Sequence, residues 1–362
     1  MGDQYAKSGV NINTNQEIVS SIKQHIDSTY PPECLKNPIF SFGNFGGAIP
    51  VPNQVLLNVL KSTDPCEQLL LVSTMDGVGT KTDFVLKHQG SQGFKTLGYD
   101  LINHCVNDTL VGGGIPLCFL DYVASNKLDP TLVARFVEGL AAACSDNSIY
   151  LDHKITLVGG ESAEMSDTYQ KGKYDLVGTM IGYQYKSTLE ASLLNPIIKG
   201  DLVLGFKSNS PHTNGYSLIR RATESRIFTE SKVYNQDQRA DLINWCCLPH
   251  KSYIDLITLL KNRKITYKKE VHITGGGWKH NPPRVLPENM EIEFNYDEYW
   301  NTMFDKDYWM MLQNITETTR DEMLEVFNCG VGLMLIISPS VYVDNKSFFE
   351  DELNSRKIGI VI

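Results

Sequence analysis

Short apolar runs alternate with amphipathic helical patterns along the whole chain, and this alternation restricts the fold to a mixed α/β class. The clearest helix is predicted over residues 131–147, because Asp129 can cap it and Pro130 lies near its first turn. Other helices are predicted over 17–27 and 253–260. Strands are predicted over 68–74, 116–124, 154–158, 175–185, 202–206, 333–337 and 358–362.

The chain of 362 residues is long enough for about two domains of roughly 150 residues each. Between Tyr185 and Asp201 the alternation gives way to a mixed segment that contains Pro196 and Gly200. We therefore predict an N-terminal domain over residues 1–186 and a C-terminal α/β domain over 187–362. No repeat of fixed period is visible, which argues against a solenoid or a propeller.

Charge and cysteine content exclude several classes of function. Lys and Arg number 33 against 42 Asp and Glu, so the formal charge is −9, without the basic run that nucleic-acid binding needs. The eight cysteines form no CxxC pair, which argues against a cysteine zinc site and favours a reducing compartment. Residues 1–15 are polar, and no apolar run approaches the roughly 18 residues of a membrane-spanning helix. We expect a soluble cytoplasmic protein with neither a nucleic-acid nor a membrane partner.

A glycine-containing segment, DGVGTK at residues 76–81, follows the predicted strand that ends at Thr74. Gly77 and Gly79 let the backbone approach a ligand, and exposed amides beside Thr80 can bind an anion. The Asp76 carboxylate suits a magnesium ion and the Lys81 ammonium suits phosphate oxygens, so the segment favours a magnesium–polyphosphate ligand. Its spacing fits neither a Walker A loop nor a Rossmann fingerprint. The alternative is an ordinary solvated turn between a strand and a helix.

A polar stripe is predicted on the helix that follows. Asp100, Asn103 and Asn107 share one helical face, which suits magnesium coordination or recognition of a polar ligand. The alternative is a solvent-facing stripe that begins with Asp100 as an N-cap. Glu161 follows two glycines after another apolar strand and is a candidate third metal ligand. Alternatively, Glu161 lies in a tight turn that opens a helix, where it favours the helix dipole.

The second half carries two polar turns. His212 and Asn214 lie in the segment PHTNGYS, where His212 could act as an acid, a base or a hydrogen-bond donor, although a lone loop histidine is more often a surface residue. Thr274, Gly275 and Gly276 follow a short strand and could cradle a phosphate, or form only a flexible turn. Arg284 could clamp a phosphate. Cys329 has no activating neighbour in the sequence, so we predict a structural role for it.

These segments together resemble the phosphoribosylformylglycinamidine cyclo-ligases, also called aminoimidazole ribonucleotide synthetases, almost from end to end. The matching segments are YAKSGV, DGVGTK, CVND, FLDY, VGGE-x-AEM, PH-x-NGYS, H-x-TGGG, FNCGVG and KIGI. The resemblance implies two α/β domains, an ATP-binding N-terminal half, and a homodimer in which N-terminal sheets associate. It also implies the conversion of formylglycinamidine ribonucleotide and ATP into aminoimidazole ribonucleotide, ADP and phosphate.

The resemblance also implies roles for individual residues. Asp76, Asp100 and Glu161 would lie near magnesium and the ATP phosphates, with Lys81 and Asn107 in the same pocket. His212 would orient the substrate or handle a proton. Together with the readings of the residues themselves, we predict contacts to the nucleotide from Gly77, Gly79, Thr80 and Asn103, and contacts to the substrate from Asn214, Thr274, Gly275, Gly276 and Arg284. The glycine-rich segment 42–47 resembles a loop that would cover the nucleotide.

The sequence departs from this pattern in four loops. The departures are Thr74-Met75, Met165-Ser166-Asp167, Ser125-Asn126-Lys127 and Pro249-His250-Lys251. None removes a proposed acid. Two alternatives remain open: another ATP-dependent enzyme of the same superfamily, such as a thiamine-monophosphate kinase, and a nucleotide-binding protein without catalysis.

Overall fold

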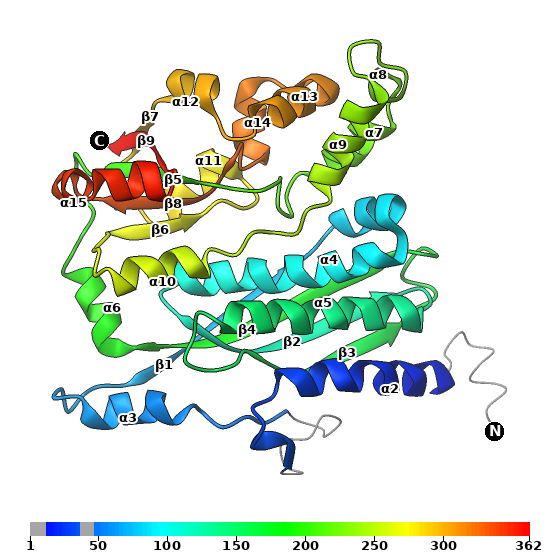
Figure 1. The fold of residues 1–362 in the computed structure, drawn as a ribbon, viewed down its shortest axis with the longest axis horizontal. Helices are drawn as coiled ribbons and strands as arrows, with labels where there is room; N and C mark the ends of the chain where they lie inside the picture. The colour runs from blue at the N-terminus through cyan, green and yellow to red at the C-terminus, as the bar shows by residue number, and fades with distance from the viewer. Residues whose placement is uncertain (1–11, 37–46) are drawn as a thin grey trace. The chain divides into compact units, whose positions relative to one another are not determined.

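The computed structural model describes residues 12–36 and 47–362, and the chain divides into two compact units, Met1–Leu189 and Glu190–Ile362. The predicted boundary after residue 186 lies close to this division. Each unit holds one β-sheet with helices packed on it (Figure 1), which confirms the mixed α/β class with two domains. Among the described residues, no helix combines the length and the apolar character that crossing a bilayer requires.

The first unit is built on a four-stranded sheet in the order β1-β4-β2-β3. β4 pairs antiparallel with both β1 and β2, and β2 pairs parallel with β3. The strands are β1 (Leu69–Gly77), β2 (Ile115–Ser125), β3 (Thr156–Glu164) and β4 (Tyr174–Tyr185). The helices are α2 (Ile12–Thr29), the 3-10 turn η1 (Cys34–Lys36), α3 (Asn53–Lys61), α4 (Lys81–Val111) and α5 (Pro130–Ser148), while α6 (Lys186–Leu193) runs across the division.

Two strands of this sheet are longer than predicted. β1 continues through Asp76 and Gly77, and β3 continues through Gly160 and Glu161, so these residues lie in strands and not in turns. The expectation that Glu161 follows the strand, or begins a helix, is therefore wrong. Glycines are poor strand formers, which shortened both predictions, but pairing with neighbouring strands extends the sheet across them.

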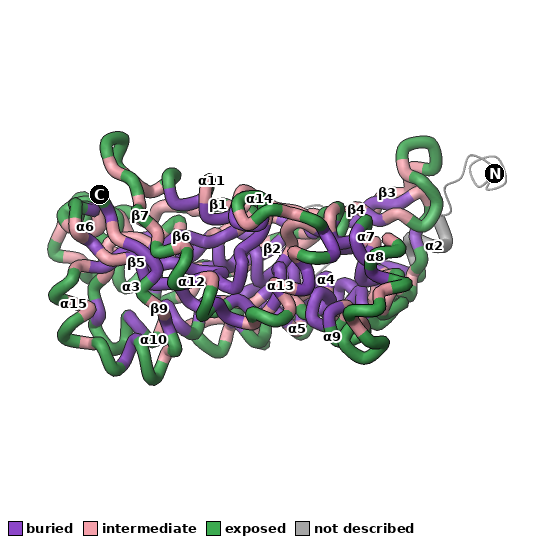
Figure 2. The backbone as a smooth tube through the Cα atoms, turned by 90° about the horizontal axis from the view of Figure 1, so that it is seen from above, coloured by how far each residue is buried: buried purple, intermediate pink, exposed green. Residues whose placement is uncertain are grey.

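Helices α4 and α5 lie side by side against the sheet (Figure 1). They approach closely because Gly98 and Gly139 carry no side chain: a Cβ on either would strike the backbone of the other helix. Residues of α4 from Gly93 onward are mostly buried (Figure 2), and Gly90, with φ 58° and ψ −145°, breaks the helix into two parts. The predicted cap of α5 is confirmed, because Asp129 Oδ1 accepts a hydrogen bond from the Thr131 amide at 2.8 Å.

The second unit contains a five-stranded antiparallel sheet in the order β6-β8-β5-β9-β7. Every residue of β8 is buried, so this strand forms the centre of the unit. The strands are β5 (Leu202–Lys207), β6 (Lys269–His272), β7 (Ile292–Phe294), β8 (Val331–Ile337) and β9 (Arg356–Val361).

Short helices surround this second sheet. They are α7 (Tyr216–Glu224), α8 (Arg226–Thr229), α9 (Gln236–Cys246), α10 (Ile254–Asn262), α11 (Gly277–His280), α12 (Tyr296–Thr302), α13 (Lys306–Thr316), α14 (Arg320–Val326) and α15 (Pro339–Asp344), with the 3-10 turn η3 (Pro282–Arg284) and the π-helical turn η4 (Phe348–Glu352). All eight cysteines of the chain are free thiols, and Cys66 alone among them is exposed. Cys329 is fully buried, and burial raises the pKa of its thiol, which fits the predicted structural role.

Candidate functional site

The segment 76–81 joins β1 to α4 in the first unit. Asp76 and Gly77 end the strand and Lys81 opens the helix, so residues 78–80 alone form the connection. Gly79 adopts φ 62°, which favours glycine, and both Gly79 and Thr80 are exposed. The connection therefore presents open backbone at a helix N-terminus, where the helix dipole favours an anion.

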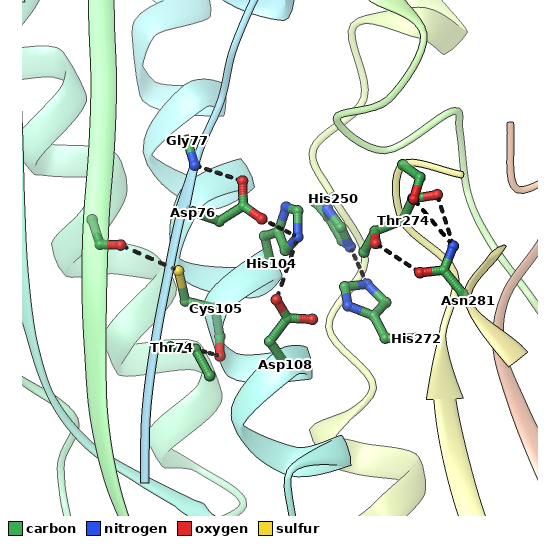
Figure 3. A network of polar contacts seen from close by, with 12 residues as sticks. Thr74, Asp76, Gly77, His104, Cys105, Asp108, His250, His272, Thr274 and Asn281 are labelled. Atoms are coloured by element: carbon green, nitrogen blue, oxygen red, sulfur yellow. Dashed lines mark hydrogen bonds and ion pairs between the residues drawn. The ribbon is translucent and has the colours of Figure 1, made fainter. Parts of the chain in front are cut away.

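Asp76 contacts His104 of α4, a residue that the sequence analysis did not single out. Asp76 Oδ2 lies 3.0 Å from His104 Nε2, and Asp108 Oδ2 lies 3.7 Å from the same nitrogen (Figure 3). The side chains of Asp76 and Asp108 are 39% and 30% exposed, whereas that of His104 is buried. Two partly accessible carboxylates therefore converge on one buried imidazole.

The electrostatics of this group follow from its geometry. Burial disfavours the charged form of His104, but the contact with Asp76 and the nearby charges of Asp108 and Asp100 outweigh burial and raise the pKa of His104. Burial likewise acts against the Asp76 carboxylate, but His104 and the Gly77 amide, which donates to Asp76 Oδ1 at 2.6 Å, lower its pKa overall. Asp76 is therefore held as an anion.

Lys81 and Asp100 form a fully buried ion pair. Lys81 Nζ lies 2.7 Å from Asp100 Oδ1, and both side chains have no exposed surface. The pair joins the first residue of α4 to the second part of the same helix, across the break at Gly90. The structure thus brings two predicted site residues together, as partners of each other.

The predicted polar stripe on α4 faces the interior. Asp100, Asn103 and Asn107 are all buried, and Asn103 Oδ1 accepts a hydrogen bond from Asn147 Nδ2 of α5 at 2.8 Å. The alternative that Asp100 caps a solvent-exposed stripe is therefore wrong. Asparagine and aspartate side chains are costly to bury without hydrogen-bond partners, so the polar stripe makes its contacts within the unit and not with solvent.

Glu161 lies at the other edge of the sheet. Asp76 pairs with Gly178, Gly178 with Asp121, and Asp121 with Gly160, so these four residues form one row across the sheet. Strands are spaced about 4.8 Å apart, which separates Asp76 from Gly160 by roughly 14 Å along the row. Glu161 follows Gly160 and is exposed. Within one chain the structure does not bring Glu161 to Asp76.

Asp121, in the same row, faces a cavity of about 260 Å³. Apolar side chains of α2 and α5 line this cavity, among them Ile18, Ile22, Val133 and Val137. Burial raises the pKa of Asp121 to about 7. Asp121 belongs to the FLDY segment, in which the sequence analysis assigned it no role.

In the second unit His212 is fully buried, so it is not a surface residue. It lies in the segment after β5 with φ 60°, and Ser210 Oγ accepts a hydrogen bond from its amide at 3.1 Å. Asn328 of the FNCGVG segment holds this loop, because its Nδ2 donates to the Ser210 carbonyl at 2.9 Å and its Oδ1 accepts from Ser208 Oγ at 3.0 Å. Asn328 thus fixes the histidine loop.

The glycine turn after β6 is ordered by Asn281. Its Nδ2 donates to the Gly277 carbonyl at 2.8 Å and to those of Thr274 and Gly275 at 3.3 Å, while its Oδ1 accepts from Thr274 Oγ1 at 3.1 Å (Figure 3). A Cβ placed on Gly275 would lie 3.5 Å from Asn214 Oδ1, so Asn214 adjoins the turn. The alternative of a merely flexible turn is therefore wrong. Arg284 is exposed at the end of η3.

Four residues of these networks were missed. They are His104, Asp108, Asn281 and His250, whose ring stacks on that of His212 with centroids 3.9 Å apart. The spacing of His104 and Asp108 by four residues on one helix was a usable signal, since such residues face each other. His250 gave no local signal, because its partners His212 and His272 are distant in sequence. Asn281 lies only four to seven residues from its partners in the glycine turn, but no helical or strand periodicity relates them. The predicted nucleotide-covering segment 42–47 lies outside the described residues except for Gly47.

Solved structures with related folds include enzymes and maturation factors. The structure of thiamine-monophosphate kinase from Stenotrophomonas maltophilia matches with a TM-score of 0.56 and 12% identity, covering 94% of this chain and 93% of that chain. E. coli HypE matches with a TM-score of 0.60 and 14% identity, covering 96% and 91%. Hydrogenase maturation protein HypE in complex with ATP matches with a TM-score of 0.52 and 13% identity, covering 93% and 85%. At these identities the likeness shows a shared fold.

Curated sequences are more similar. The phosphoribosylformylglycinamidine cyclo-ligase of Methylobacillus flagellatus is 37% identical over 339 residues, covering 92% of this chain and 87% of the relative. That of Lactococcus lactis subsp. cremoris is 34% identical over 359 residues, covering 99% and 95%.

Family models match both halves of the chain. "AIR synthase related protein, N-terminal domain" matches residues 59–184, and "AIR synthase related protein, C-terminal domain" matches residues 199–362. With the full-length relatives at more than 30% identity, these matches show that the chain belongs to the AIR synthase family of enzymes.

Proposed function

We propose that the protein is a phosphoribosylformylglycinamidine cyclo-ligase, a cytoplasmic enzyme of purine biosynthesis. It would use ATP to close formylglycinamidine ribonucleotide into 5-aminoimidazole ribonucleotide, with release of ADP and phosphate. The amide oxygen of the substrate would accept the γ-phosphoryl group, which gives an imidate phosphate. A nitrogen of the amidine would then attack the same carbon, so that the ring closes and phosphate leaves.

The observation that carries this proposal is the anionic Asp76 beside an open backbone connection, in a chain similar to cyclo-ligases over nearly its whole length. The Asp76 carboxylate can hold a divalent cation, and the open backbone around Gly79 can bind phosphate oxygens, as binding of a polyphosphate requires. A structural relative, HypE, has been solved in complex with ATP, which agrees with a nucleotide site in this fold.

The residues of the first unit fit a magnesium ion. Mg²⁺ prefers oxygen ligands and keeps several waters, so one or two accessible carboxylates suffice. Asp76 and Asp108 have this character, since both are partly exposed and face the same imidazole. Asp100 is fully buried against Lys81, which favours a supporting role for that acid. When bound, the ion would neutralise phosphate charge during phosphoryl transfer.

The chain's own groups would do the remaining work. The exposed backbone around Gly77, Gly79 and Thr80 would hold phosphate oxygens at the start of α4. Lys81 would keep Asp100 neutralised and fix this end of the helix. In the second unit His212 would orient the substrate, with Asn214 and the Thr274–Gly276 turn binding its polar groups, and Arg284 reaching its phosphate.

We further propose a homodimer through the first unit. Leu71 and Met75 of β1 are 75% and 69% exposed. Met75 and Leu120 of β2 both pair with Thr179 of β4, the strand between them, so they lie on the same face of the sheet. An exposed apolar sheet face of this kind marks an association surface. Because Glu161 lies about 14 Å from the Asp76 row position, we propose that Glu161 of the partner subunit completes the site.

Phosphate release tests the reaction. With ATP and Mg²⁺, formylglycinamidine ribonucleotide should support turnover and thiamine monophosphate should not. Asp76→Asn should lower kcat/KM at least about 100-fold, because charge near the transferred phosphoryl group is lost. Asp27→Asn is the matched control, since Asp27 pairs with Lys23 on the surface of the same unit. Turnover with thiamine monophosphate would instead assign a kinase, and ATP binding without any turnover would assign a non-catalytic protein.

Mixed dimers test the role of Glu161. Asp76→Asn and Glu161→Gln should each inactivate the homodimer, whereas a heterodimer of the two variants should regain one intact site, because both changes fall in the other site. Co-expression with two affinity tags isolates the heterodimer for the phosphate assay. An inactive heterodimer would place both residues in the same chain's site.

A further inference from the structure

Three histidines of the second unit come together from distant parts of the sequence. His212 follows β5, His250 precedes α10, and His272 ends β6. Nitrogen atoms of the three rings all lie within 4.8 Å of one another. Nε2 of His250 lies 3.0 Å from Nε2 of His272 (Figure 3). The rings of His212 and His250 stack with centroids 3.9 Å apart. From this grouping we propose that His212, His250 and His272 bind a divalent transition-metal ion, with Zn²⁺ as the preferred occupant.

The contact between His250 and His272 leaves one ring nitrogen able to bind a metal. His212 and His250 have no exposed surface and His272 is 5% exposed, so the grouping lies inside the protein. A single proton can lie between the two Nε2 atoms, which means that one of them directs a lone pair at the other. Neutral imidazole with a free lone pair is the commonest metal ligand in proteins. A metal ion in place of the shared proton would satisfy both nitrogens.

The distances fit a tetrahedral ion. Zn–N bonds of about 2.0–2.1 Å place two ligand nitrogens roughly 3.3 Å apart. The observed spread, from 3.0 Å up to 4.8 Å, brackets this value, and binding requires the ring of His212 to turn out of its stack on His250 so that both lone pairs meet at the ion. Three nitrogen ligands leave a fourth position for water. An all-nitrogen set selects zinc, cobalt, nickel or copper over magnesium, which separates this site from the proposed carboxylate site.

The backbone holds the three rings in place. His212 has a left-handed φ of 60°, and the Ser210 hydroxyl and Asn328 fix its loop. Gly332 of β8 makes room, because a Cβ there would lie 2.5 Å from Cε1 of His212 and would strike the hydroxyl of Tyr253. His272 is paired to Leu333 in the sheet. The backbone of the three ligands is therefore fixed, and metal binding needs only side-chain rotation.

Metal titration of the full-length, tag-free protein tests the proposal. After dialysis against EDTA, the protein should bind one Zn²⁺ per chain by calorimetry, and Co²⁺ should give the intense visible absorption of a tetrahedral nitrogen site. His250→Gln should weaken Zn²⁺ affinity at least about 100-fold, since a direct ligand is lost. His280→Gln, which alters a histidine that is 61% exposed, is the matched control and should bind as the unchanged protein does.

A second readout separates binding from folding. Zn²⁺ at 100 times the Kd of the unchanged protein should raise the Tm of that protein and shift the Tm of His250→Gln far less. Absence of a tetrahedral Co²⁺ spectrum in the unchanged protein would overturn the site even if His250→Gln fails to fold. Equal Zn²⁺ affinity in His250→Gln, or loss of binding in His280→Gln alone, would overturn it as well. None of these outcomes depends on cyclo-ligase activity.

Discussion

The two units bury polar side chains with different chemistry. In the first, buried charges are matched in pairs, as in Lys81 with Asp100 and His104 with Asp76. In the second, the buried polar groups around the candidate site are imidazoles and amides, such as His250 and Asn281, that bond to each other or to backbone. The first arrangement suits a charged polyphosphate, and the second suits hydrogen bonding to a substrate and coordination of a metal ion by ring nitrogens. Removing one partner should therefore be more costly in the first unit.

The largest expected effect is on the buried ion pair. Lys81→Met removes the buried lysine partner of the Asp100 carboxylate, so the free energy of unfolding should fall by about 3–5 kcal/mol in urea titration. Lys95→Met is the control, because Lys95 pairs with Glu138 at 3.0 Å with 42% and 24% of the side chains exposed. Its loss should stay below about 1 kcal/mol. Equal losses in the two variants would contradict the contrast drawn above.

The corresponding change in the second unit is Asn281→Ala. It leaves the carbonyls of the glycine turn without their donor and should cost about 2 kcal/mol of unfolding free energy. Asn314→Ala is the control, since Asn314 donates to Tyr234 Oη on the surface of the same unit. If the turn binds substrate, KM for formylglycinamidine ribonucleotide should rise more than kcat falls. A loss as large as that of Lys81→Met would remove the difference between the units.

Asp121 provides a further test of the first unit because, unlike Asp76 and Asp100, it forms no ion pair with another described residue. Its pKa is raised to about 7 by burial, so the folded state holds a proton that the unfolded state releases near pH 4. Its carboxyl therefore lowers stability progressively as pH rises from about 4 to 7, and the penalty is constant above that range. Asp121→Asn should gain on the order of 1–2 kcal/mol at pH 8 and less at pH 5. An equal gain at both pH values, measured by urea unfolding, would contradict a buried titrating acid.

Much of the fold could be predicted from the sequence because the apolar patterns are local. Strand β4 and helix α5 were placed within a residue or so at each end, since alternation and capping are read from neighbours. Strands β1 and β3 were cut short at their glycines, because pairing that extends them involves residues far along the chain.

The site was less predictable because many of its contacts join residues that are distant in sequence. Asp76 and Gly79 could be singled out from local composition. The pairing of Lys81 with Asp100, the separation of Asp76 from Glu161, and the grouping of His212 with His250 depend on tertiary contacts. Burial of Asn103 and Asn107 could not be predicted either, because it depends on packing against other elements, such as the contact of Asn103 with Asn147 of α5.

Gly332 carries no functional group, yet its missing side chain is a requirement for the ring of His212. A substitution such as Gly332→Ala would displace the imidazole without altering any atom that touches a ligand. Genetic selections that score only lost activity would group this position with the histidines. The defect would arise because the added methyl group fills the space that the ring of His212 needs. Free imidazole would therefore not restore activity in this variant.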